Sequence, residues 1–170
     1  MNDNRPWQHC RTDSPLGPVR LARTARGLCG LWFELDHRHA PAAQCFAPAQ
    51  HSPQDPLLRE AVQQLGAYFQ GQRLSFGLPL DLGAGTAFQQ SVWQTLLTIP
   101  AGQTRSYQDL AIALGQPNAA RAVGAAVGRN PVSIIVPCHR VLGSKGQLTG
   151  YAGGLWRKQA LLQGENPSPP

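Results

Sequence analysis

The residues best suited to chemistry in this sequence lie in the segment PCHRV at 137–141. Cys138 stands between a proline and His139, and Arg140 comes next. A thiolate is the strongly nucleophilic form of cysteine, and neighbours that carry positive charge or accept a proton favour it. The segment therefore indicates a nucleophilic cysteine, although a buried cysteine without such neighbours is usually no more than a small hydrophobic side chain.

A base at His139 would need a path to the sulfur and a group that orients its ring. Adjacent residues of an extended chain point to opposite sides, so we expect a bound water molecule or a turn to relay the proton. Carboxylates are common orienting groups, and residues 86–170 hold two, Asp109 and Glu165. Asp109 suits a helix start. Glu165 is therefore the predicted partner of His139, the alternative being a solvated residue near the C-terminus.

The segments around the cysteine are expected to place it in a pocket. Residues 132–136, VSIIV, predict a short buried strand that delivers Cys138 to a fixed place, and Pro137 fixes the backbone before it. The glycines between 143 and 154 permit close approach of backbone amides to a ligand, and Tyr151 offers an aromatic wall. These features predict one side of a binding pocket.

Two short helices joined by a tight turn are predicted at 106–114 and 119–127, which is typical of a helix-turn-helix. Ser106 with Asp109 fits the start of the first, and Asn118 is the predicted cap of the second. The second helix presents Ala, Gly and Val apart from Arg121. Such a slender helix with one cation suits insertion into a narrow nucleic-acid groove, the alternative being a small helix packed inside the protein.

Four elements are expected ahead of this pair: a hairpin of 19–24 and 28–35, an exposed loop at 39–56, an amphipathic helix at 56–70 and a connection at 71–85. A capping box of Thr86 and Gln89 then predicts a helix. Its buried face is expected to contain Phe88, Val92, Leu96 and Leu97.

Composition bounds the class of protein. The 170 residues suffice for one large or two small domains, and the formal charge is +6. Residues 1–85 hold eight Arg against seven acidic residues, whereas residues 86–170 hold five Arg and two Lys against two. That excess is expected of a surface that meets phosphates, or one that aids solubility. Four scattered cysteines and a polar N-terminus without a signal-peptide pattern predict a cytoplasmic protein.

Five motifs follow one another in the second half: GTAFQQSVW at 85–93, SYQDLA at 106–111, ARAVGAAVGRNP at 120–131, PCHRV at 137–141 and TGYAGGL at 149–155. In type and order they resemble those of the 6-O-alkylguanine-DNA alkyltransferases, also called methylated-DNA-protein-cysteine methyltransferases. SPLGPV and GLCGLWF resemble the N-terminal domain of that family more loosely.

The resemblance implies an α/β N-terminal domain, with a small antiparallel sheet plus a helix, followed by a mostly helical C-terminal domain with a winged-helix-like helix-turn-helix. We expect the first domain at 1–80, a connector at 81–85, a DNA-binding and alkyl-acceptor domain at 86–166 and a flexible tail at 167–170. Members of the family bind the minor groove, flip the damaged guanine and move its alkyl group irreversibly to cysteine. The implied partner is double-stranded DNA containing 6-O-alkylguanine, with no membrane, no obligate protein partner and no cofactor.

The resemblance also implies residue roles. Cys138 matches the alkyl acceptor, which His139, water and Glu165 activate. Tyr107 matches a tyrosine that donates to N3 of guanine, and Asn130 matches a hinge asparagine. The positions expected to contact DNA or substrate are Arg121, which fills the gap left by the flipped base, Ala120, Ala122, Gly124, Ser133, Tyr151, the carbonyl of Val141 and the backbone amide of Ala152.

Some positions depart from the family pattern. Ser133 stands where some members have proline, and Trp156 and Gln159-Ala160 replace charged and aromatic residues, so the preferred alkyl group stays open.

Some members hold zinc in the N-terminal domain. Cys10, Cys29 and several histidines form no tight ligand pair here, so we expect no metal.

Three other functions compete with this interpretation. A non-catalytic relative that binds alkylated guanine and flags it for repair would lack the cysteine of the PCHR motif. A transcription regulator would need several base-reading polar side chains on the second helix, which carries Arg121 alone. A cysteine hydrolase would turn over and leave no permanent adduct.

Overall fold

The structure is a computed structural model that describes residues 7–47 and 50–166. Its N-terminal part is an antiparallel sheet in the order β1-β2-β3, formed by β1 (Gln8–Thr12), β2 (Val19–Thr24) and β3 (Gly27–Phe33). The hairpin of β2 and β3 confirms the prediction, and β1 adds a strand that the sequence pattern did not indicate. The expected flexible tail lies outside the described residues.

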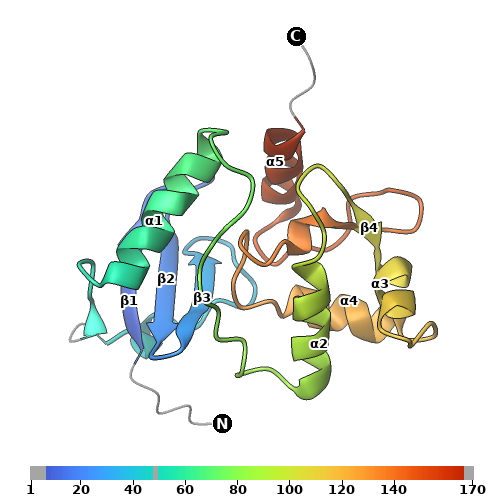
Figure 1. Cartoon of the computed structure of the whole chain (residues 1–170), viewed down its shortest axis with the longest axis horizontal. Coiled ribbons are helices and arrows are strands. Elements are labelled where there is room, and N and C mark those ends of the chain that lie inside the picture. The colour runs from blue at the N-terminus through green and yellow to red at the C-terminus, as the bar shows by residue number, and fades with distance from the viewer. Residues whose placement is uncertain (1–6, 48–49, 167–170) are drawn as a thin grey trace.

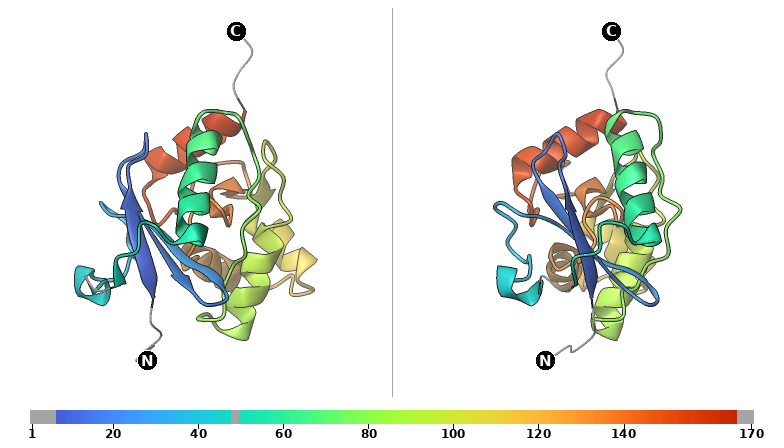
Figure 2. Two further views of the ribbon diagram at one scale, coloured as in Figure 1. Left: turned by 60° about the vertical axis from the view of Figure 1, so that its left-hand side comes forward. Right: turned by 90° about the vertical axis from the view of Figure 1, so that its left-hand side faces the viewer.

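Helix α1 (Pro56–Phe69) packs on the sheet and also reaches the other half of the molecule (Figure 2). It begins where the Asp55 side chain accepts a hydrogen bond from the amide of Leu58, with a proline in the first turn. Leu58 and Leu65 on its inner face are buried. At its last turn Tyr68 is buried as well, against the C-terminal part.

The C-terminal part is mostly helical (Figure 1). Its elements are α2 (Ala87–Leu96), β4 (Arg105–Ser106), α3 (Tyr107–Ala113), α4 (Ala120–Gly128), β5 (Val141–Leu142) and α5 (Leu155–Glu165). The predicted capping box at the start of α2 is present, and Ser106 with Asp109, predicted as a helix start, forms a second capping box at α3. Helices α3 and α4 pack against each other as the predicted helix pair. The fold is thus an α/β N-terminal domain followed by a helical C-terminal domain.

Two details of these helices were predicted wrongly. Asn118 does not cap α4, because the chain enters the helix at Ala119 and makes no side-chain capping bond there. Leu97 does not belong to the buried face of α2, because the helix ends at Leu96 and Leu97 is 39% exposed. Trp93 is buried instead, and its indole N–H donates to the carbonyl of Ala126 in α4.

The predicted strand at 132–136 is also wrong, although the segment is buried. Val132 forms a single bridge to Leu31 of β3, and the chain then turns, with Ile134 at a φ of 70°. The side chain of Asn130 drives the turn: its Oδ1 accepts from the amide of Val132 and its Nδ2 donates to the carbonyl of Val136. Backbone hydrogen bonds in both directions with Leu31 hold this turn against the sheet, immediately ahead of the cysteine.

Candidate active site around Cys138

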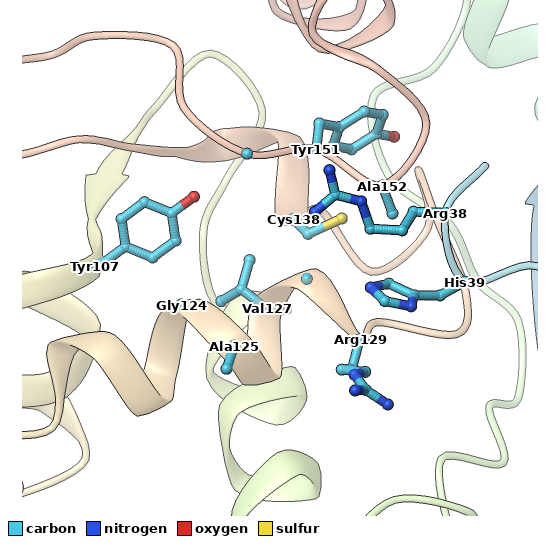
Figure 3. Close-up of a pocket in the computed structure, with 12 residues that line it drawn as sticks. Arg38, His39, Tyr107, Gly124, Ala125, Val127, Arg129, Cys138, Tyr151 and Ala152 are labelled. Carbon is cyan, nitrogen blue, oxygen red and sulfur yellow. The ribbon is translucent and has the colours of Figure 1, made fainter. Parts of the chain in front are cut away.

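Cys138 begins a short 3₁₀ helix, Cys138–Arg140, and lines a cavity of about 350 Å³ (Figure 3). Five of the predicted site residues meet in this lining: Tyr107, Gly124, Cys138, Tyr151 and Ala152. The structure thereby joins α3, α4, the cysteine segment and the glycine-rich loop before α5 around one space. Cavities of a few hundred cubic ångströms are of the size that accepts small organic groups.

Other predicted site residues lie apart from the cavity lining. Arg121 and Ala122 are exposed on the outer face of α4, and Ala120 stands at its start. Val141 and Ser133 are buried behind the pocket, and the hydroxyl oxygen of Ser133 lies 3.2 Å from Nε2 of His37. Helix α4 is therefore half-buried: small residues cover its outer face, while Val123, Ala126 and Val127 face the core.

The sulfur of Cys138 is held in a polar but enclosed environment. Nδ2 of Asn130 donates to Sγ at 3.1 Å, so the residue that shapes the turn also contacts the sulfur. Burial raises the pKa of the Cys138 thiol, while the donation from Asn130 and the charge of Lys158 act in the opposite direction. The thiol therefore needs a base before it can act as a nucleophile.

His139 has the contacts expected of that base. Nε2 lies 2.8 Å from Oε1 of Glu165, and because an ionised carboxylate can only accept, Nε2 carries the hydrogen. Nδ1 therefore holds a free lone pair. It is buried and has no hydrogen-bond partner within the part of the chain that the structure describes. Burial lowers the pKa of His139 and Glu165 opposes this, so the ring is neutral near pH 7 and able to take up a proton.

Glu165 is shared by more donors than the sequence indicated. Arg140 donates to it twice, from Nε to Oε2 at 2.9 Å and from Nη2 to Oε1 at 2.8 Å. The hydroxyl of Tyr68 in α1 donates to Oε1, also at 2.8 Å. Burial alone would raise the pKa of Glu165, but the hydrogen bonds from His139 and Arg140 outweigh it and bring the pKa to about 2.

Lys158 is a further buried cation that the sequence analysis missed. Its Nζ donates to the carbonyls of Thr149 and Gly150, and the hydroxyl of Tyr107 donates to the same Thr149 carbonyl. Burial lowers the pKa of Lys158 to about 8. The spacing of the residues could have predicted its burial. Positions 158, 161 and 165 fall on one face of α5, and Leu161 on that face is a core residue.

The cavity mouth carries three cationic or titratable side chains that the sequence analysis also missed: Arg38, His39 and Arg129. Figure 3 shows them on one side of the cavity, opposite Tyr107. The amide of Arg38 donates to the carbonyl of Ala152, which attaches this N-terminal loop to the pocket wall. Burial and the charges of Arg129 and Arg38 lower the pKa of His39. The loop has no periodicity, so its position was invisible in the sequence.

Neither a metal site nor a membrane span is found in the described ranges. Between residues 7 and 166, with 48 and 49 left aside, no group of three His, Cys, Asp or Glu side chains is arranged to hold a metal ion. Over the same residues, no helix has the length and apolar composition needed to cross a bilayer. Cys10, one of the candidate ligands, is a buried thiol whose pKa burial raises to about 11.

Comparison with known proteins identifies one family over most of the chain. Residues 87–167 match the model of the 6-O-methylguanine DNA methyltransferase DNA-binding domain, and residues 11–82 match that of its ribonuclease-like domain. A methylated-DNA--protein-cysteine methyltransferase of Mycobacterium leprae is 51% identical over 91% of this chain and 90% of its own length. One from Methanosarcina barkeri is 47% identical over 89% of this chain and 92% of its own.

Solved structures of a methyltransferase superpose on almost the whole of this chain. The crystal structure of the Mycobacterium tuberculosis O6-methylguanine methyltransferase superposes with a TM-score of 0.82 at 48% identity, covering 96% of this chain and 95% of that one. The same bacterial protein in complex with DNA gives 0.82 at 47% identity, covering 94% and 93%. This chain therefore belongs to the 6-O-methylguanine DNA methyltransferase family.

Proposed function

We propose that this protein repairs DNA by moving the alkyl group of 6-O-alkylguanine to its own Cys138. The thiolate sulfur attacks the alkyl carbon, an S–C bond forms, and the bond between that carbon and O6 breaks. The electron pair of the broken bond stays with the guanine. The product is a stable thioether, so each molecule acts once. The observation that carries the proposal is the contact chain from Asn130 and Cys138 to His139 and Glu165 inside a family member.

The proton of the thiol leaves through His139. A water molecule hydrogen-bonded to both Sγ and Nδ1 would pass the proton to Nδ1, the ring nitrogen that lacks a protein partner in the described residues. Glu165 stabilises the resulting imidazolium, since its own pKa of about 2 keeps it ionised. Arg140 and the buried histidine ring hold the carboxylate in place.

The other side of the cavity serves the leaving guanine. The hydroxyl of Tyr107, which donates to the carbonyl of Thr149 at the cavity wall, donates instead to N3 of the bound purine, so that guanine departs without negative charge and Tyr107 regains a proton from solvent. Gly124 permits the base to approach α4, because only the ring of Tyr107 lies near its missing side chain. The backbone around Tyr151 and Ala152 closes the pocket.

Duplex DNA reaches this cavity through α4. The exposed, small residues of the helix let it enter the minor groove, and Arg121 takes the place of the flipped guanine in the stack. Arg38 and Arg129 at the cavity mouth neutralise backbone phosphates beside the extruded nucleotide. These roles rest on exposure, charge and position relative to the pocket.

The direct test is peptide mass spectrometry after the protein is mixed with a duplex that contains one methylated guanine. We expect a stoichiometric gain of one methyl group on Cys138, read in the fragment 130–140. Cys138→Ser should lose all transfer and keep its affinity for DNA, whereas Cys45→Ser, at an exposed cysteine outside the site, should be methylated like the parent. Tight lesion binding with an unmodified Cys138 in the parent would instead establish a damage-recognition protein without repair activity.

A further inference from the structure

The hydroxyl of Tyr68 links the N-terminal domain to the proton relay. Tyr68 lies 97 positions from Glu165 in the sequence, yet its Oη donates to Oε1 of that carboxylate at 2.8 Å. The ring is 7% exposed and packs against Phe69 and Phe76, at centroid distances of 5.4 and 5.3 Å. Figure 1 shows the end of α1 beside α5, where this contact forms. The side chain is thus fixed by packing and aimed at the carboxylate.

One oxygen of Glu165 serves three donors at the same distance. Oε1 accepts from Tyr68, from Nε2 of His139 and from Nη2 of Arg140, each at 2.8 Å. A carboxylate oxygen offers about two lone pairs, so three donors must share them. Each hydrogen bond on Oε1 is therefore weaker than it would be alone, and the bond to His139 depends on whether Tyr68 is present.

We propose that Tyr68 is a positioning residue of the proton relay, which fixes Oε1 of Glu165 and sets how strongly that carboxylate supports a proton on His139. The role rests on the proposed function, because it assigns a task within the same relay. It makes the N-terminal domain a part of the reactive centre rather than a scaffold beside it.

The direction in which the pKa of His139 should change when the Tyr68 hydroxyl is removed follows from the charged groups around the histidine. These are Glu165 and Lys158 of α5 and Arg140 of its own 3₁₀ helix, while Tyr68 of α1 contacts Glu165. Loss of the Tyr68 hydroxyl leaves more of the carboxylate charge to His139, and the imidazolium becomes easier to form. The pKa of His139 then rises.

The test is Tyr68→Phe in the full-length chain. If the pKa of His139 rises, the ring is already protonated at a higher pH and cannot take the thiol proton there. The low-pH limb of the single-turnover transfer rate should therefore move to higher pH. We expect a shift of roughly half to one pH unit, which corresponds to one hydrogen bond. The titration of His139, followed by NMR of labelled imidazole, should move by the same amount in the same direction.

A matched control separates hydrogen bonding from packing. Phe76→Leu loosens the contact with the Tyr68 ring but leaves its hydroxyl and Glu165 unchanged. It should lower the midpoint of thermal unfolding, and it should move the His139 titration by less than Tyr68→Phe does, because the hydroxyl remains. An equal shift in Phe76→Leu, or an unmoved titration in folded Tyr68→Phe, would overturn the proposal.

A second variant keeps the proposal testable if Tyr68→Phe does not fold. Fluorotyrosine at position 68 retains the ring and hydroxyl but is the stronger donor, so the His139 titration should move to lower pH. A shift in the other direction, or none, contradicts the proposed role. The NMR titration needs no alkyl transfer, so it answers the question even if Cys138 of the parent takes up no methyl group.

Discussion

Cys138 lies between two regions of opposite character. Behind it, Glu165, His139 and Arg140 are buried and joined by hydrogen bonds of 2.8 to 2.9 Å. In front of it, Arg38 and Arg129 are exposed at the cavity mouth. Buried charges interact strongly and are little screened by salt, whereas exposed charges act over a distance and are screened. The buried relay should therefore control the transfer step, and the mouth should control association with DNA.

The strongest test of this contrast is Glu165→Gln in the buried relay. The change leaves the Arg140 guanidinium buried without its counter-charge, which costs about 3–5 kcal/mol of unfolding free energy. Transfer should slow by roughly 10²-fold or more, because the imidazolium is no longer stabilised. Denaturant unfolding and single-turnover assays measure the two effects. Glu34→Gln is the control: this carboxylate pairs with Arg11 and Arg20 on the sheet surface, and its loss should cost about 1 kcal/mol or less.

The same carboxylate predicts a loss of stability in acid. The pKa of Glu165 is about 2 when folded, below its value near 4.3 in an unfolded chain. A depressed pKa contributes stability that is present above the unfolded value and is lost as the pH falls through the folded one. We expect on the order of 3 kcal/mol to disappear between about pH 5 and pH 2. Glu165→Gln should lack this part of the slope, and parallel curves for parent and variant would contradict the assignment.

Arg121 tests the DNA-facing region with an intermediate effect. Arg121→Ala should reduce transfer from alkylguanine in a duplex by roughly 10- to 100-fold, because an open gap in the stack costs a few kcal/mol. Transfer from the free base needs no flipping and should change little. Competing the two substrates against each other measures the difference. Lys145→Ala, at an exposed cation in another loop of the same half, is the control. An equal loss on both substrates would rule out the intercalating role.

Sequence alone predicted those parts of the fold that depend on neighbours in the chain. The capping box at Thr86 and the helix start at Ser106 were predicted correctly, because each set of hydrogen bonds stays within its own first turn. The segment 132–136 was not, since its composition favours a strand while the side chain of Asn130 bends it into a turn. The helix cap was also misassigned to Asn118.

The site residues also divide into those that the sequence predicted and those that only the fold reveals. The PCHRV motif pointed to Cys138 and His139, and the choice between two carboxylates pointed to Glu165. The structure brings the histidine and the carboxylate into contact. Neither the motif nor that choice pointed to the third donor on Glu165, because the bond from Tyr68 spans 97 positions and two domains. Arg38 escaped notice for a similar reason: it is one cation in an irregular loop, and only the fold attaches that loop to Ala152.

The smallest effect is expected at the cavity mouth, from Arg38→Ala. If Arg38 neutralises one phosphate, the slope of log affinity against log salt concentration should become shallower by about one, and binding should weaken similarly for all sequences. The pH dependence of transfer should stay unchanged, because the Arg38 side chain makes none of the hydrogen bonds that hold Glu165. Arg59→Ala, on the exposed face of α1, should leave the salt slope unchanged. A shifted pH profile in Arg38→Ala would mean that the two regions are coupled through the pocket, and the separation between binding and transfer would fail.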